Sequence, residues 1–357
     1  MKEHVRGTDV MSKQKEMPVY NINEDLYAIE DRLYVIGDVH GCYEEFKQLV
    51  TGILMQDERA QFVLVGDIVD RGPNTWEILE WAMNNVNRRS GRFKMIMGNH
   101  EHMKINYLEN YLSGKAAGYY NSLVDIPADT YNFRDVLIEH KASDEKIVEI
   151  CNFFKSLPIY YEVNVKVRQY NYSEKKKHFI IVHSDVRREY LNKDETFKRR
   201  VITPKGIWEI RRTGKPNPIS SILEDRNYFG HSELNHTIIV HGHTPTIIND
   251  LVIRGAKSGC IDFKYNDINV DCGIVFKNAQ KPTANLAAIR LDDLEEFYLY
   301  KYPEELYGNA TNRRGNHYKN IMTGKEKIKK EKMTKKKREE SDQLMEEALK
   351  QLGLTDK

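Results

Sequence analysis

Short apolar runs alternate with longer amphipathic stretches along the chain from residue 33 onward. The runs 33–38 (LYVIGD), 61–67 (QFVLVGD) and 93–99 (FKMIMGN) have the length and continuous hydrophobicity of buried strands. Each is followed by a stretch in which apolar residues recur at helical spacing, namely 43–54, 73–88 and 101–112. This alternation predicts βαβ units and a sheet with parallel strands.

Beyond residue 143 the pattern changes from alternation to a succession of strands. Residues 143–158 begin with a serine cap and an acidic first turn, which predicts one more helix. The strand-like runs that follow are 159–170, 178–185, 236–244, 268–276, 285–291 and 295–302. We expect them to form a second sheet packed face to face on the first. The predicted fold class is therefore α/β (α+β), with two packed mixed sheets flanked by helices in a four-layer sandwich.

The composition of the chain divides it into three parts. Residues 1–30 are polar and lack periodicity, which predicts a loosely attached arm. Residues 31–305 form the expected folded domain, with a cap-like insertion at about 101–150. Residues 306–357 carry a basic block and then apolar residues at helical spacing. The preferred interpretation of this tail is a solvated amphipathic helix, and the alternative is a helix that docks a partner or attracts an anion.

Charge and cysteine content narrow the class of protein. A net charge of +2 over 357 residues is too small to favour nucleic-acid or membrane binding by bulk electrostatics. The four cysteines lie far apart without a CxxC pair, which indicates reduced thiols rather than a disulfide framework. The first twenty residues lack the apolar segment of a signal peptide, and no stretch is apolar enough to span a bilayer. We therefore expect a soluble, cytoplasmic protein.

Five of the strand-like runs end in side chains that can bind a metal. These side chains are Asp38 and His40, then Asp67 with Asp70 and Arg71 beyond it, then Asn99 and His100, then His183, and finally His241 and His243. In α/β sheets, ligands gather at the carboxyl ends of strands. Carboxylates, imidazoles and an amide together suit Mn²⁺, Fe²⁺ or Zn²⁺.

Any one of these motifs has an ordinary structural explanation. A Gly-Asp pair after a strand is commonly a turn, and a single histidine at a strand end is more often hydrogen-bonded than metal-bound. Five such motifs in succession are not explained in this way. Their number is sufficient for two ions about 3.5–4 Å apart that share one carboxylate, the arrangement that attacks phosphate esters.

The sequences GDVHG, GDIVDRG and GNHE, followed by IVHSD and VHGHTP, resemble the signature blocks of the phosphoprotein phosphatase family within the calcineurin-like metallophosphoesterases. INVDCG followed by AAIRL resembles the closing strands of its bacterial and phage members. The resemblance implies a dinuclear centre in which Asp67 bridges two ions, with Mn²⁺ expected ahead of Fe²⁺ or Zn²⁺. It assigns the remaining ligands as Asp38 and His40 for one ion, and Asn99, His183 and His243 for the other.

The resemblance also implies catalytic roles. Arg71 would bind phosphoryl oxygens, His100 would protonate the leaving oxygen, and Asp70 would orient His100. A second phosphate-binding arginine is expected downstream, and GIWEIRR offers Arg211 or Arg212 as candidates. The sequence HSDV departs from the family pattern and adds Ser184 and Asp185 near the site, which affects the expected substrate geometry.

The expected activity is hydrolysis of phosphate monoesters, first as a Ser/Thr protein phosphatase, because the intact VDRGP sequence favours that branch. Two alternatives within the same chemistry are a symmetrical bis(5′-nucleosyl)-tetraphosphatase and a phosphatase for 2′,3′-cyclic phosphate or other RNA ends. The expected partner is thus a phosphoprotein or nucleotide phosphoester, with nucleic acid only as an RNA-end substrate. An alternative of another class is a non-catalytic binding protein on the same fold.

Overall fold

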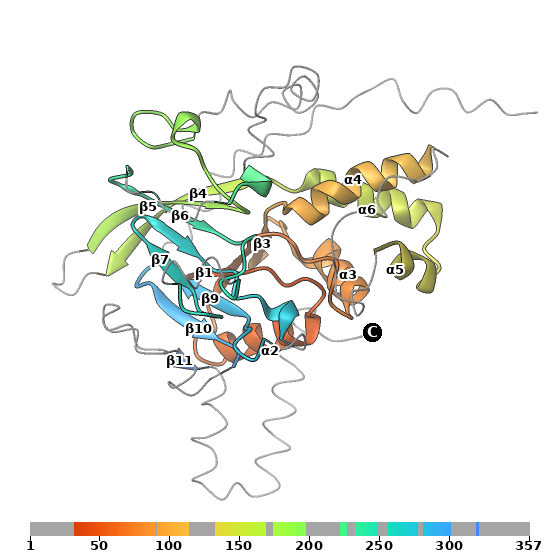
Figure 1. Cartoon of the computed structure of the whole chain (residues 1–357), viewed down its shortest axis with the longest axis horizontal. Coiled ribbons are helices and arrows are strands. Elements are labelled where there is room, and N and C mark those ends of the chain that lie inside the picture. The colour runs from red at the N-terminus through yellow and green to blue at the C-terminus, as the bar shows by residue number, and fades with distance from the viewer. Residues whose placement is uncertain are drawn as a thin grey trace, which may run out of the picture.

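The structure is a computed structural model of the whole chain (Figure 1). It describes residues 32–89, 91–113, 133–168, 174–197, 222–226, 231, 233–248, 256–277, 281–300 and 319–320. The predicted arm and nearly all of the predicted tail lie outside the described residues, and so do Arg211 and Arg212. The predicted division into arm, domain and tail therefore stays a prediction.

The first sheet has six strands in the order β11-β10-β9-β1-β2-β3. Strands β1, β2 and β3 are parallel neighbours at one end of this order, as the alternation of apolar and amphipathic stretches predicts. Strands β9 and β10 continue the sheet as antiparallel neighbours beside β1. The strand bounds are Leu33–Ile36 (β1), Gln61–Leu64 (β2), Phe93–Met95 (β3), Ala287–Arg290 (β9), Glu295–Tyr298 (β10) and Lys319–Asn320 (β11).

The expectation that every late strand joins the second sheet is wrong for β9 and β10. Strand β1 is buried along its whole length and has β2 on one edge only. Its other edge needs backbone partners, because buried N–H and C=O groups are costly when unpaired. Residues Ala288–Arg290 supply them by pairing antiparallel with Tyr34–Ile36.

The second sheet has five strands in the order β4-β5-β6-β8-β7. The bounds are Tyr160–Arg168 (β4), Glu174–Val182 (β5), Thr237–His241 (β6), Asp262–Lys264 (β7) and Asp267–Asn269 (β8). The predicted strand 268–276 is correct only at its beginning. Gly273 adopts a left-handed backbone (φ 72°), and the 3₁₀ turn η2 follows at Ile274–Phe276. The Asp271 carboxylate accepts the Gly273 N–H and stabilises this turn away from the sheet.

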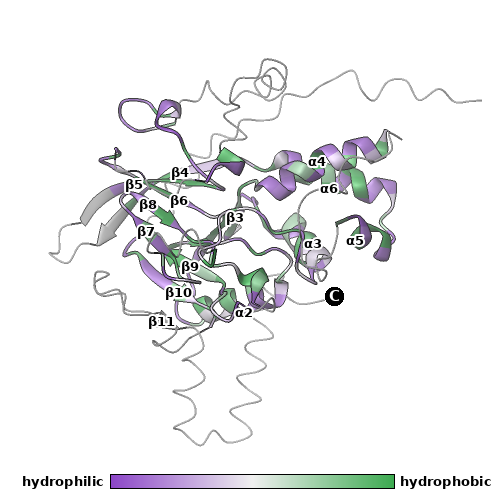
Figure 2. Ribbon diagram, in the orientation of Figure 1, coloured by the Kyte–Doolittle hydropathy of each residue, from purple (hydrophilic) through white to green (hydrophobic). Residues whose placement is uncertain are grey.

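The two sheets pack face to face through alternate residues of their strands. Val35 and Val63 from the first sheet share a buried apolar cluster with Phe179, Ile181 and Val240 from the second. Figure 2 shows hydrophobic residues, in green, concentrated in the strands at the centre of the molecule. The intervening positions of the first sheet, such as Tyr34 and Phe62, face the other way and join a larger cluster with the helices. The prediction of two packed mixed sheets flanked by helices is confirmed.

Five helices lie between β1 and β4 in the described part of the chain. Helices α2 (Tyr43–Leu54), α3 (Thr75–Asn85), α4 (Asn99–Leu112), α5 (Phe133–Glu139) and α6 (Asp144–Ser156) follow the first three strands. Helix α4 packs on α6, and Lys155 of α6 pairs with Glu109 of α4 at 2.6 Å (Figure 1). The predicted insertion at 101–150 thus contains most of α4, all of α5 and the first half of α6. No helix in the described residues combines the length and hydrophobicity that crossing a bilayer requires.

Candidate metal centre

The loops after five strands bring the predicted ligands to one place. Asp38 and His40 follow β1, Asp67 follows β2, and Asn99 begins α4 just after β3. His183 and His243 come from the second sheet, directly after β5 and two residues after β6. Asp38, His40, Asp67 and His183 are buried, and the last has no exposed surface. The carboxyl ends of strands from both sheets therefore converge on a polar, buried centre.

The backbone of these loops is strained at the site. His40, Asp67, Asp70, Arg71 and His243 all have positive φ, between 44° and 72°. Side-chain-bearing residues avoid this left-handed region, and the cost of holding them there is of order 1–3 kcal/mol each. Such strain persists only where the surrounding structure imposes it. The fold is thus holding these residues in unfavourable conformations that aim their side chains at one another.

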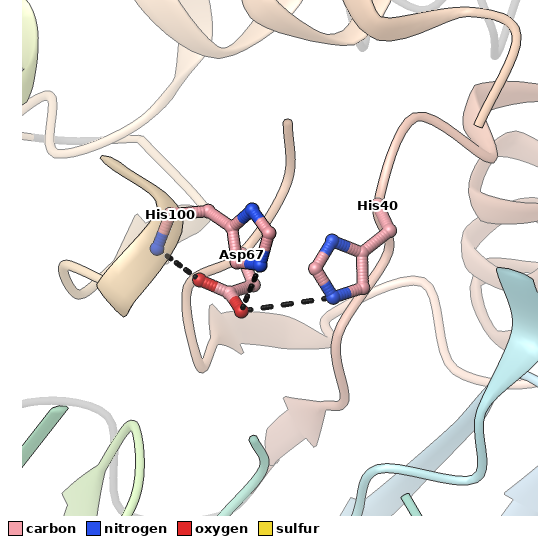
Figure 3. A group of neighbouring side chains, drawn as sticks. All are labelled: His40, Asp67 and His100. Carbon is pink, nitrogen blue, oxygen red and sulfur yellow. Dashed lines mark hydrogen bonds and ion pairs between the residues drawn. The ribbon is translucent and has the colours of Figure 1, made fainter. Parts of the chain in front are cut away.

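Asp67 lies between two groups of potential ligands. Its Oδ2 is 3.6 Å from His40 Nε2 and 3.3 Å from His183 Nε2. Asn99 Oδ1 lies 2.9 Å from both His183 Nε2 and His243 Nδ1. The groups His40–Asp67–His100 and Asp67–His183–His243 each present ligand atoms within 4.8 Å of one another (Figure 3 shows the first). Asp67 alone belongs to both groups, as a bridging carboxylate would.

Hydrogen bonds fix the orientation of two of the imidazoles. His40 Nδ1 donates to Val69 O at 3.0 Å, and His183 Nδ1 donates to Val65 O at 2.8 Å. With Nδ1 bound to a carbonyl, the Nε2 atoms face the centre, an arrangement commonly seen for metal-ligating histidines. His243 Nε2 is buried without a hydrogen-bond partner among the described residues. These donors fit a metal ligand set.

The electrostatics of the centre favour cations. Burial, followed by the charge of Asp271, raises the pKa of Asp38. Burial would lower the pKa of His183, but the Asp67 carboxylate raises it to about 10, so a positive charge is stabilised there. Burial and the Arg71 guanidinium instead lower the pKa of His40, which keeps that imidazole neutral and able to coordinate. Crowded carboxylates beside neutral imidazole suit divalent ions.

Glu101 supports the loop that carries Asp67 and was not assigned a role from sequence. Its Oε2 accepts the N–H groups of Asp67 (2.8 Å) and Gly98 (2.9 Å), and its Oε1 accepts the N–H of Ile68 (2.9 Å). Glu101 has no exposed surface. The signal that could have found it is a glutamate in the first helical turn after a strand, since such residues commonly bind backbone N–H groups there. It ties β2, β3 and α4 together at the bridging carboxylate.

Of the residues predicted to act on the substrate, His100 belongs to the first ligand group, and Asp70 and Arg71 contact it. His100 Nδ1 is 2.6 Å from Asp70 Oδ2, the contact expected for an oriented imidazole. Arg71 donates to His40 Nε2 at 2.6 Å and to His100 Nε2 at 3.1 Å, so its guanidinium fork lies between the two rings. His100 Nε2 is also 3.8 Å from Asp67 Oδ2. The rings of His100 and His40 meet edge to face with centroids 4.7 Å apart.

Two residues flagged near the signature blocks have partners outside the centre. His241 Nε2 pairs with Asp267 Oδ1 at 3.1 Å, and His241 is not among the ligands that the family resemblance implies. Asp185, the extra carboxylate of the HSDV sequence, is buried and pairs with His231 Nε2 at 2.8 Å. Its charge is therefore compensated by His231 inside the protein.

Two site residues lack any assignment from the sequence. Arg226 is exposed, and its charge is one of the influences that, after burial, lower the pKa of His243. Asp271 is near enough to Asp38 for its charge, after burial, to raise the pKa of Asp38, and a Cβ on Gly37 would come 3.3 Å from Asp271 Cα. Burial raises the pKa of Asp271 to about 6. Arg226 follows an aspartate shortly before the last histidine block, which is the only sequence signal that points to it.

Comparison with known proteins agrees with this geometry. Residues 31–256, more than half of the chain, match the calcineurin-like phosphoesterase family model. Asymmetrical bis(5′-nucleosyl)-tetraphosphatase PrpE of Halalkalibacterium halodurans is 25% identical over 273 residues, covering 73% of this chain and 90% of that protein. The enzyme of the same name from Oceanobacillus iheyensis is 27% identical over 260 residues, covering 69% and 86%.

Solved structures with similar folds are more distant in sequence. A putative diadenosine tetraphosphatase has a TM-score of 0.40 and 15% identity, with 77% of this chain and 95% of that chain covered. The cold-active protein-tyrosine phosphatase of a Shewanella species has a TM-score of 0.39 and 18% identity, with 76% and 81% covered. The family match and the described centre together lead to one conclusion: the chain belongs to the calcineurin-like phosphoesterases.

Proposed function

We propose that the chain hydrolyses phosphate esters with two divalent ions that share Asp67. Asp38 and His40 would complete one ligand set, and Asn99, His183 and His243 the other. The observation that carries this proposal is the position of Asp67 Oδ2, within 3.6 Å of imidazole nitrogens from both groups. When bound, such ions lower the pKa of water toward about 7 and neutralise charge on the phosphoryl group.

The chain's own residues would bind the phosphoryl group and protonate the leaving oxygen. Arg71 presents two donor nitrogens, and this fork matches two oxygens of a phosphate. The His100 ring would then be released from Arg71 and could deliver a proton from Nε2. Asp70 holds the opposite nitrogen at 2.6 Å and so keeps Nε2 pointed toward the centre. No nucleophilic serine or cysteine is needed in this scheme.

A phosphorylated serine or threonine is the first candidate substrate. Its leaving group is an alkoxide, which departs slowly unless it is protonated in the transition state. General acid catalysis contributes about 10²–10⁴-fold in such cases. The short Asp70–His100 contact is the observation that supports this class, because a nucleotide leaving group is stable as an anion and has less need of an acid.

A dinucleoside tetraphosphate is the second candidate substrate, and the relatives support it. Proteins named asymmetrical bis(5′-nucleosyl)-tetraphosphatases align over about 86–92% of their own length. Those named symmetrical align over only 23–35% of their own length. Among dinucleotide activities, asymmetrical cleavage is therefore favoured over the symmetrical cleavage that the sequence offered as an alternative.

The test compares kcat/KM of the Mn²⁺-loaded protein on a phosphoserine peptide and on diadenosine tetraphosphate. A higher value for the peptide supports the first candidate. A higher value for the dinucleotide supports the second, and products of ATP and AMP rather than two ADP would identify asymmetrical cleavage. Turnover of neither, with only an RNA 2′,3′-cyclic phosphate hydrolysed, would refute both candidates.

A further inference from the structure

Lys104 contacts the predicted acid pair from helix α4. It lies four residues after His100, so the two side chains occupy the same helix face one turn apart. Lys104 Nζ is 2.7 Å from Asp70 Oδ2. His100 Nδ1 is 2.6 Å from the same oxygen. One carboxylate oxygen thus binds two donors from successive turns of one helix.

The geometry of Asp70 makes this shared oxygen important. Its other oxygen, Oδ1, is buried without a hydrogen-bond partner among the described residues. The carboxylate is therefore held by Oδ2 alone, on a left-handed backbone with φ 69°. Burial would raise the pKa of Asp70, but Lys104 and then His100 lower it to about 2. Without Lys104, a single hydrogen bond to His100 would have to orient a buried carboxylate.

The other side of Lys104 is also fixed. Its Nζ lies 5.5 Å from the centroid of the Phe133 ring, a cation–π distance. Phe133 is the first residue of α5 and is 1% exposed. The Lys104 side chain itself is only 18% exposed. The ammonium group is thus held between Asp70 and an aromatic ring, unlike the ammonium of a mobile surface lysine.

We propose that Lys104 is a positioning residue for the acid, holding the Asp70 carboxylate in the orientation that sets the His100 ring. This inference rests on the proposed function, in which His100 protonates the leaving oxygen. Helix α5 contributes to this positioning, since Phe133 contacts the Lys104 ammonium group through its aromatic ring. Direct binding of substrate by Lys104 is disfavoured because its ammonium group is already paired with the Asp70 carboxylate.

The test is Lys104→Met, assayed on phenyl phosphate and on p-nitrophenyl phosphate, whose leaving group is better. We expect kcat on phenyl phosphate to fall about tenfold and kcat on p-nitrophenyl phosphate to change less than about twofold. KM and bound metal should be unchanged, and Lys104→Arg should restore most of the loss. Lys155→Met is the matched control, because it breaks an ion pair to α4 at Glu109 without touching Asp70.

A double-mutant cycle separates positioning from a general structural effect. In a His100→Ala background, Lys104→Met should cause no further loss of kcat on phenyl phosphate, because Lys104 acts through His100. Equal losses on both substrates, additive losses in the double variant, or a raised KM would overturn the inference.

An NMR measurement tests the positioning role of Lys104 separately from the proposed function. In protein labelled with ¹⁵N-histidine, the His100 Nδ1–H proton bound to Asp70 should give a downfield NMR signal. Lys104→Met should weaken or shift that signal, whereas Lys104→Arg and Lys155→Met should retain it. If the wild type hydrolyses neither aryl phosphate, the proposed function fails while this signal still tests the contact. An unchanged signal in Lys104→Met would refute the positioning role.

Discussion

Glu101→Gln removes one acceptor oxygen from the carboxylate that holds the Asp67 loop. If the amide oxygen takes the place of Oε2, it keeps the N–H groups of Asp67 and Gly98. The amide NH₂ then faces the Ile68 N–H, so two donors meet where an acceptor was. A buried donor without an acceptor costs about 1–3 kcal/mol, and the two remaining bonds lose their charge assistance. We therefore expect a loss of roughly 2–4 kcal/mol in the free energy of unfolding.

Thermal unfolding followed by circular dichroism measures this loss. At about 2–4 °C per kcal/mol for a domain of this size, Tm should fall by roughly 4–16 °C. The matched control is Glu149→Gln on α6, where the exposed carboxylate pairs with Lys146 and the expected change is within about 0.5 kcal/mol. A Tm for Glu101→Gln within about 1 °C of the wild type would refute the argument that three buried N–H groups depend on this carboxylate.

Three further predictions concern turnover, close packing and pH. His100→Ala should lower kcat on alkyl phosphates about 10²-fold or more in steady-state assays. Elemental analysis should show that the variant keeps its bound metal. Loss of the metal would instead indicate that His100 is a ligand. Gly242→Ala places a Cβ against Asp38 Oδ1 and should displace this proposed ligand, so the amount of retained metal and the turnover rate should both fall. Wild-type metal content and turnover in this variant would contradict the prediction. Burial lowers the pKa of His231, but Asp185 raises it to about 9, above the unfolded value of 6.5. The Asp185–His231 pair should therefore stabilise the protein fully below about pH 6.5, and this effect should be lost as pH rises through 9. In urea unfolding, the difference in free energy of unfolding between the wild type and His231→Leu should shrink over that range. A constant difference would contradict the prediction.

The strands and the order of the candidate ligands could be predicted from sequence for a simple reason. Buried parallel strands give continuous apolar runs, and the residues that follow them meet at one edge of the sheet. Asp38, Asp67 and Asn99 follow such runs directly, so their convergence needed no knowledge of distant contacts. His183 and His243 follow the same rule in the second sheet.

The remaining features depend on contacts between distant parts of the chain. The pairing of Ala288–Arg290 with β1 is decided by an open sheet edge, which leaves no mark in the local pattern. Lys104 resembles any lysine on an amphipathic helix until the fold brings it to Asp70. His231 and Asp185 are 46 positions apart and belong to no common motif. Single polar residues of this kind acquire a role only from the side chain that they meet.

The number of Mn²⁺ ions retained per chain, in the wild type and in Asp67→Asn, tests the central claim most directly. The shared carboxylate is the feature that joins the two ligand groups, since Asp67 Oδ2 lies near both His40 and His183. Elemental analysis after desalting should give two ions for the wild type and a loss of both for Asp67→Asn. One ion or none in the wild type, or two ions in Asp67→Asn, would contradict a dinuclear centre bridged by this aspartate.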